Sequence, residues 1–199
     1  GAMGRDNTLP DQVEGMKQLA ARHPFIDIDR AAMWGNAGGG FITADAMFRY
    51  PDFFKVGISE SGNHDQRLYE DDWGERYQGL LRRLGGAHQT GGTEPLDSYE
   101  AEANQTLAKN LKGKLFLMHG MMDDNVPPQN TYVVMEALIK ANKDFDLLLL
   151  PSQRHGFGID GPYVMRRRWD YFVKHLLGVE PPQEYKLPAV TPPGRPPGN

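Results

Sequence analysis

The stretch Trp34-Gly35-Asn36-Ala37-Gly38-Gly39-Gly40-Phe41, WGNAGGGF, joins two patterns of different period. Before it, residues 30–34 form a short apolar run that predicts a buried strand. After it, apolar residues recur at helical spacing and predict a helix over 38–50. Glycines between a strand and a helix permit a turn too tight for larger side chains. The stretch therefore predicts a strand–turn–helix unit, the building block of an α/β fold.

Within this turn, Gly35-Asn36-Ala37-Gly38-Gly39 has the spacing of a G-x-S-x-G motif. Such a motif raises a serine hydroxyl above the sheet on a sharp turn. Here the middle position holds Ala37, and a methyl group cannot attack a carbonyl. One interpretation is a hydrolase turn whose serine is replaced. The other is a glycine-rich turn that cradles phosphate or only packs.

The rest of the chain alternates strand and helix patterns. Apolar runs predict strands over 55–59, 115–118 and 145–150, and helical spacing predicts helices over 8–23, 133–138 and 164–177. This alternation favours a mostly parallel sheet with helices on both faces. The polar and aromatic segment 63–111 interrupts it and predicts a largely helical excursion over one end of the sheet. In the last helix we expect Arg166-Arg167-Arg168 to face water and Trp169 to face the core.

The composition and net charge of the chain exclude several classes of function. The chain has 199 residues, 39% of them hydrophobic, which suits one domain with a sizeable core. The net charge of -4, with both signs interspersed, argues against nucleic-acid binding, and no apolar run is long enough to predict a membrane span. Without cysteine, disulfides and thiolate chemistry are excluded. No cluster of histidines and carboxylates has ligand spacing, so no metal or organic cofactor is implied.

Candidate catalytic residues follow three predicted strands. In open parallel sheets, binding and catalytic residues lie at the carboxyl ends of the strands. Ala37 follows the first strand, Asp123 and Asp124 follow the strand 115–118, and His155 follows the last. Nucleophile position, acid and histidine thus occur in the α/β-hydrolase order. His155 would act as general base, an aspartate would orient it, and the backbone N–H of Gly38 would donate to the oxyanion. Considered alone, the histidine could have a structural role and the two aspartates could belong to a solvated turn. The order of all three positions along the chain favours a catalytic triad.

These stretches carry a specific resemblance. The matching segments are 35–40, Tyr50-Pro51-Asp52-Phe53-Phe54-Lys55, His119-Gly120 with 123–126, and His155-Gly156. On them the chain resembles the hydrolase domain of the prolyl oligopeptidase / dipeptidyl-peptidase IV family of serine peptidases, from about residue 11 to 177. The resemblance implies that Asp123, rather than Asp124, is the triad acid.

The same resemblance implies a substrate pocket. Tyr69 and Trp73 match the aromatic wall of the pocket for the residue before the cut bond, and Asn125 and Val126 match positions that border it. The alternative for the aromatic residues is packing along one helix face, because Tyr69, Trp73 and Tyr77 are spaced at i, i+4 and i+8.

The activity implied by the resemblance is hydrolysis of peptide bonds through an acyl-enzyme, with dipeptidyl, internal and isopeptide cleavage all open. With Ala37 in place of serine, we expect turnover to fall by about a millionfold. Because the surrounding motif is intact, we hypothesise a deliberate serine-to-alanine change. The alternatives are a natural pseudo-hydrolase that binds peptides, and an esterase or acyl-peptide hydrolase of the same fold.

Length suggests a partial domain. Thirty-six residues precede Ala37, whereas a full α/β hydrolase places several strand–helix units there. We expect residues 5–180 to be the C-terminal portion of the catalytic domain, 1–4 a tag remnant, and 181–199, with seven prolines, a disordered tail. The first strand would then expose an edge that recruits a second copy or a complementing chain. A periplasmic or secreted location is suggested by the resemblance alone.

Overall fold

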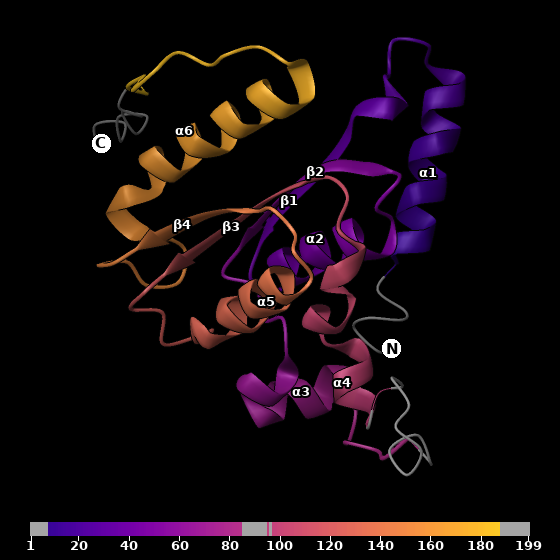
Figure 1. Ribbon diagram of the computed structural model, residues 1–199, viewed down its shortest axis with the longest axis vertical. Coiled ribbons are helices and arrows are strands. Elements are labelled where there is room, and N and C mark those ends of the chain that lie inside the picture. Colours follow the sequence, from indigo (N-terminus) through magenta and orange to yellow (C-terminus); the bar gives the residue numbers. More distant parts are fainter. Residues whose placement is uncertain (1–7, 85–94, 96, 188–199) are drawn as a thin grey trace, which may run out of the picture.

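A parallel sheet of four strands forms the centre of the computed structural model, which describes residues 8–84, 95 and 97–187. The strands are β1 (Ala31–Asn36), β2 (Phe54–Glu60), β3 (Lys114–Gly120) and β4 (Asp146–Leu150), and they lie in that order across the sheet (Figure 1). All four predicted strands are present. Because the strands are parallel, their carboxyl ends meet at one edge of the sheet.

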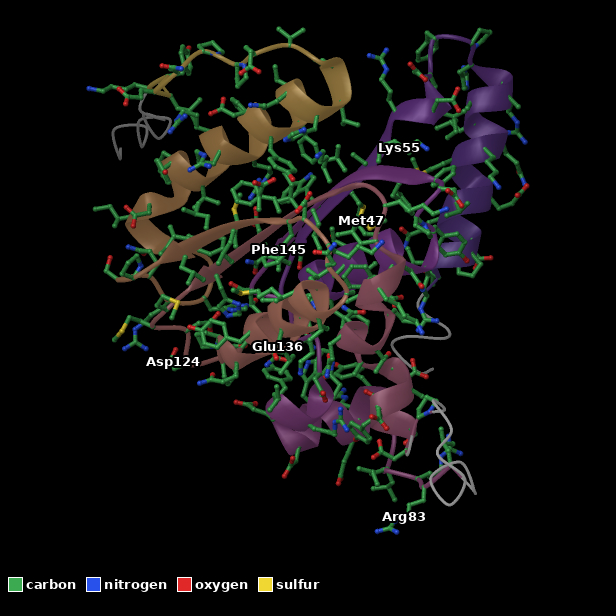
Figure 2. The ribbon with its side chains drawn as sticks, in the orientation of Figure 1. Met47, Lys55, Arg83, Asp124, Glu136 and Phe145 are labelled. Carbon is green, nitrogen blue, oxygen red and sulfur yellow. The ribbon has the colours of Figure 1, made fainter. Side chains whose placement is uncertain are left out.

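Helices cover both faces of the sheet, as the sequence predicts. Alternate side chains of β3 point to opposite faces, so Leu115 and Leu117 enter one apolar cluster and Phe116 and Met118 another. Covering the first face are α1 (Leu9–Arg22), α2 (Gly38–Arg49) and α5 (Gln129–Lys140), and covering the second is α6 (Gly161–Phe172), extended by a π-helical turn over Val173–Leu177. Met47 lies in the interior between α2 and the sheet (Figure 2).

Strand β1 is less buried than its apolar pattern predicts, and it lies at the edge of the sheet, as the partial length of the domain led us to expect. Most of its residues are half-buried, and Trp34 is 51% exposed. Within the described residues, β1 pairs with β2 and has no strand on its other side. Burial of this strand is therefore incomplete because its outer edge is open.

The helical excursion between β2 and β3 is confirmed for the described residues. It contains the short helices η2 (Gln66–Leu68), α3 (Asp71–Gln78), α4 (Ser98–Glu102) and η4 (Asn104–Asn110). Helices α3 and α4 lie beyond the sheet, on the side away from α6 (Figure 1). Residues 85–94 and 96 lie outside the described part.

Helix α6 reverses the expected orientation of its arginines. The Arg168 side chain is 14% exposed and bonds to Glu60, and Arg166 bonds to Asp170. Trp169, by contrast, is 52% exposed. Arg168 turns inward because the buried carboxylate of Glu60 needs a cationic partner there.

The predicted end segments are largely outside the description. Residues 1–7 and 188–199 are not described, and residues 181–187 form neither helix nor strand. None of the described helices is long and apolar enough to cross a membrane.

Candidate active site

The turn after β1 holds Ala37 in a strained conformation. Its φ of 55° and ψ of -120° are unusual for a residue with a side chain. Its N–H donates to the carbonyl of Glu60 at 2.9 Å, and its own carbonyl accepts from the N–H of Phe41 at 3.0 Å. Such strain costs about 1–3 kcal/mol and persists where the surroundings impose it. The turn has the strand–turn–helix geometry that a G-x-S-x-G motif requires.

Two glycines allow this turn to close. A Cβ on Gly35 would lie 2.5 Å from the backbone of Gly39, and one on Gly40 would lie 2.4 Å from the carbonyl oxygen of Glu60. A Cβ on Gly38 would meet nothing within 4 Å. Gly38 is therefore not required by crowding, unlike Gly35 and Gly40.

The loops after β3 and β4 bring Asp123 and His155 together. Nδ1 of His155 lies 2.8 Å from Oδ2 of Asp123. The other carboxylate oxygen accepts from the N–H groups of Asn125 at 3.0 Å and Val126 at 2.9 Å. The Asp123 side chain is buried, and that of His155 is 26% exposed. The carboxylate therefore orients the imidazole, leaving Nε2 for the other side.

The neighbouring carboxylate behaves differently. Asp124 pairs with Arg154, and both side chains are largely exposed. This bond lowers the pKa of Asp124 below its usual range. The side chain lies at the margin of the molecule (Figure 2). Of the two adjacent aspartates, Asp123 contacts His155.

A further histidine supports the same carboxylate, and sequence reasoning assigned it no role. Nε2 of His119 lies 2.9 Å from the carbonyl oxygen of Val126 and 3.3 Å from Oδ2 of Asp123, and its Nδ1 lies 2.7 Å from Oγ1 of Thr131. Because a carbonyl only accepts, Nε2 carries the hydrogen. Burial lowers the pKa of His119, which keeps it neutral. Its position at the end of an apolar strand was the available signal.

The aromatic residues of α3 and its approach form a stack. Tyr69 and Trp73 are 5.4 Å apart between ring centroids, and Trp73 and Tyr77 are 4.6 Å apart. Tyr69 also donates from its hydroxyl to Oδ1 of Asn125 at 3.0 Å. This bond joins the aromatic stack to the loop that carries Asp123.

Val126 contributes mainly through its backbone. Its side chain is 1% exposed. Its N–H holds Asp123 and its carbonyl holds His119. The structure therefore places this residue inside the loop that supports the carboxylate.

A cavity of about 810 Å³ lies beside the turn, along the open edge of β1. Among its lining residues, Asn36 adjoins Ala37 and Gly156 adjoins His155. Glu60 and Arg168 also line it, joined by two bonds of 2.9 and 3.0 Å. The guanidinium lies 3.8 Å from the ring centroid of Trp34. Burial raises the pKa of Glu60, and Arg168 opposes that shift.

The described residues contain no group of three or more His, Asp or Glu side chains that is arranged to hold a metal ion. The structure brings together an imidazole oriented by a carboxylate and a strained turn between a strand and a helix, two of the parts that acyl transfer requires.

Comparisons with known proteins agree with this geometry. The sequence model of the prolyl oligopeptidase family matches residues 3–178, so the chain belongs to that family. It is a hydrolase domain of the serine-peptidase type, and the α/β-hydrolase fold predicted from the sequence is confirmed.

Its relatives include dipeptidyl peptidases. Human dipeptidyl peptidase 8 is 30% identical over 152 residues, covering 76% of this chain and 16% of that protein. Bovine dipeptidyl peptidase 4 is 31% identical over 149 residues, covering 74% and 18%. The crystal structure of Porphyromonas gingivalis dipeptidyl peptidase 4 superposes with a TM-score of 0.73 at 26% identity, covering 88% of this chain and 23% of that one. The chain thus spans less than a quarter of each.

Proposed function

We propose that this domain belongs to a serine peptidase that hydrolyses peptide bonds through an acyl-enzyme. The observation that carries the proposal is the 2.8 Å contact between His155 and Asp123, at the same sheet edge as the strained turn of Ala37. Relatives named as dipeptidyl peptidases support a peptide substrate.

Each residue has a role in this proposal. A serine at position 37 would attack the scissile carbonyl while His155 takes its proton, and His155 would then protonate the leaving amine. Asp123 would hold the imidazole and stabilise its charged form. The N–H of Gly38 would donate to the oxyanion.

The pocket proposal rests on the contact between Tyr69 and Asn125. Because Oδ1 of Asn125 accepts from Tyr69, its Nδ2 group points elsewhere and can donate to a substrate carbonyl. Tyr69 and Trp73 would wall the apolar side of the pocket. Val126 would support the pocket from beneath.

We further propose that Ala37 is a replaced serine and that the chain is inactive as it stands. The strained backbone supports this, because strained residues are concentrated at active sites and ligand-binding turns. An alanine codon in the natural gene would instead favour a peptide-binding pseudo-hydrolase.

The test is labelling with a fluorophosphonate probe after Ala37→Ser. Label on the restored serine, lost on His155→Ala, is the expected result. The unaltered chain with Ala37 serves as the blank. Absence of label in the restored protein would contradict the proposal, and faster turnover of esters than of peptides would favour the esterase alternative.

A further inference from the structure

A second polar cluster, formed by Ser59, His64 and Asn104, lies against the first turn of α2. Ser59 is the second-last residue of β2, His64 lies in the loop that follows this strand, and Asn104 is the first residue of η4. Each of the three is at most 2% exposed. None has a role in the mechanism proposed above.

Two of these side chains hold carbonyl groups of α2. Ser59 Oγ donates to the carbonyl of Gly40 at 2.8 Å, and Asn104 Nδ2 donates to the carbonyl of Phe41 at 2.9 Å. Both carbonyls belong to the helical turn that directly follows Ala37. Side chains from strand β2 and from helix η4 therefore both hydrogen-bond to the first turn of α2.

His64 links the two. Its Nδ1 lies 2.9 Å from Asn104 Nδ2, and its Nε2 lies 3.3 Å from Ser59 Oγ. An amide nitrogen only donates, so Nδ1 accepts and Nε2 carries the hydrogen. Ser59 then accepts from His64 and keeps its own hydrogen for Gly40. Burial lowers the pKa of His64 to about 3, so the ring stays neutral.

The cluster is packed at contact distance against the turn. A Cβ on Gly62 would lie 2.6 Å from Cε1 and Nε2 of the His64 ring, so only glycine leaves room for it. The same Cβ would lie 3.0 Å from the carbonyl carbon of Gly40. A side chain at position 62 would therefore displace either the imidazole or the first turn of α2.

Serine, histidine and asparagine in this arrangement resemble a triad, but the geometry excludes that role. The cluster is buried, and the Ser59 hydrogen is donated to a backbone carbonyl. A substrate has no access to it.

We propose that Ser59, His64 and Asn104 are positioning residues that hold the first turn of α2, and thereby the strained backbone of Ala37 and the N–H of Gly38. Strained residues persist where the surrounding contacts over-determine them, and these contacts do so from two elements. The catalytic consequence rests on the proposed function.

The first test needs no activity and uses the chain as it is. Amide hydrogen exchange is measured by NMR in His64→Leu. The control is Tyr171→Phe, which removes a partly buried bond of 2.8 Å to Asp146 elsewhere in the molecule. In His64→Leu we expect the amides of Ala37 and Phe41 to exchange about tenfold faster, because local opening becomes easier, with the end of α2 unchanged. Ser59→Ala, a milder change, should show the same local effect. Uniform acceleration along α2, or none, would overturn the proposal.

The second test uses the Ala37→Ser background and fluorophosphonate labelling. His64→Leu should lower the maximal labelling rate by about 100-fold through misplacement of the serine, with the half-saturating probe concentration unchanged. His64→Gln, which can still donate and accept, should recover most of the rate. A change in half-saturation alone would overturn the positioning role. If the restored serine takes no label while the cluster is intact, the proposed function is wrong. The hydrogen-exchange experiment still tests the positioning role of the cluster, because it does not depend on activity.

Discussion

The phenol of Tyr69 donates to the side-chain oxygen of Asn125 at 3.0 Å, across 56 positions of sequence. In Tyr69→Phe, built on Ala37→Ser, the Asn125 amide loses this restraint. We expect KM for a peptide substrate to rise about two- to tenfold, the worth of one hydrogen bond, with kcat little changed. Tyr77→Phe is the control because it keeps the ring stack with Trp73. An equal effect of both variants would contradict the role given to the bond.

The two adjacent aspartates provide a matched pair of variants. Asp123→Asn in the restored enzyme should lower kcat by about 10⁴-fold, because the amide favours the wrong tautomer of His155. Asp124→Asn removes an exposed partner of Arg154 and should leave kcat within about twofold, since exposed pairs contribute little. Steady-state kinetics on both variants checks this, and the reverse order would refute the assignment.

The strain at Ala37 predicts opposite outcomes for one substitution at two places. Ala37→Gly should stabilise the fold by about 1 kcal/mol, because glycine tolerates positive φ. Ala44→Gly, in the middle of α2, should destabilise it by about 1 kcal/mol or more. Denaturant unfolding measures both free energies. A loss of stability in Ala37→Gly would show that the turn is unstrained.

Burial of His64 predicts a pH dependence of stability. The native ring has a pKa of about 3, against 6.5 for an ordinary histidine, so unfolding takes up a proton between these values. Above pH 6.5 the ring is neutral in both the folded and the unfolded state, so it does not reduce the stability. As the pH drops from 6.5 towards 3, only the unfolded state binds the proton, and the free energy of unfolding falls by about 1.4 kcal/mol per pH unit. In His64→Gln, unfolding should take up about one proton fewer between these two pKa values, so the unfolding free energy should depend less steeply on pH by about 1.4 kcal/mol per pH unit. An unchanged slope in denaturant titrations would contradict a neutral buried His64.

The open edge of β1 predicts self-association. We propose that a second copy of the chain pairs with this edge, next to the exposed ring of Trp34. Light scattering after size exclusion should show a dimer at micromolar concentration, weakened in Trp34→Lys because charged edges resist pairing. Leu19→Lys, an exposed position on α1, is the control. A monodisperse monomer would contradict the proposal, and a strand from another polypeptide would show as protection of β1 only in its presence.

Local pattern was enough to predict the secondary structure. Apolar runs located all four strands, and helical spacing located the helices that cover them. The glycines of the turn, followed by carboxylates and a histidine after later strands, indicated the candidate residues, and the structure brings two of them, Asp123 and His155, together. Each of these signals lies within a few neighbouring residues, where backbone sterics and side-chain period dominate.

What sequence reasoning missed depends on contacts between distant residues. Arg168 was expected to face water, but it pairs with Glu60, 108 positions away. The cluster around His64 carried no local signal, because its partners come from other elements. His119 stood at the end of an apolar strand, but its contact with Asp123 became visible only in the structure. The apolar run at 30–34 predicted a buried strand by its pattern alone, whereas the exposure of β1 depends on which strands lie beside it.

The sequence by itself determined the order of strands and helices, the glycine turn and the set of candidate residues. The family resemblance implied Asp123 as the acid, and the tertiary structure shows the contact itself: two adjacent aspartates on one loop point in different directions, and Asp123 meets His155. Only the tertiary structure decided that Ala37 is strained and held from β2 and η4. These outcomes depend on sheet register and loop closure, which join residues that local periodicity does not relate.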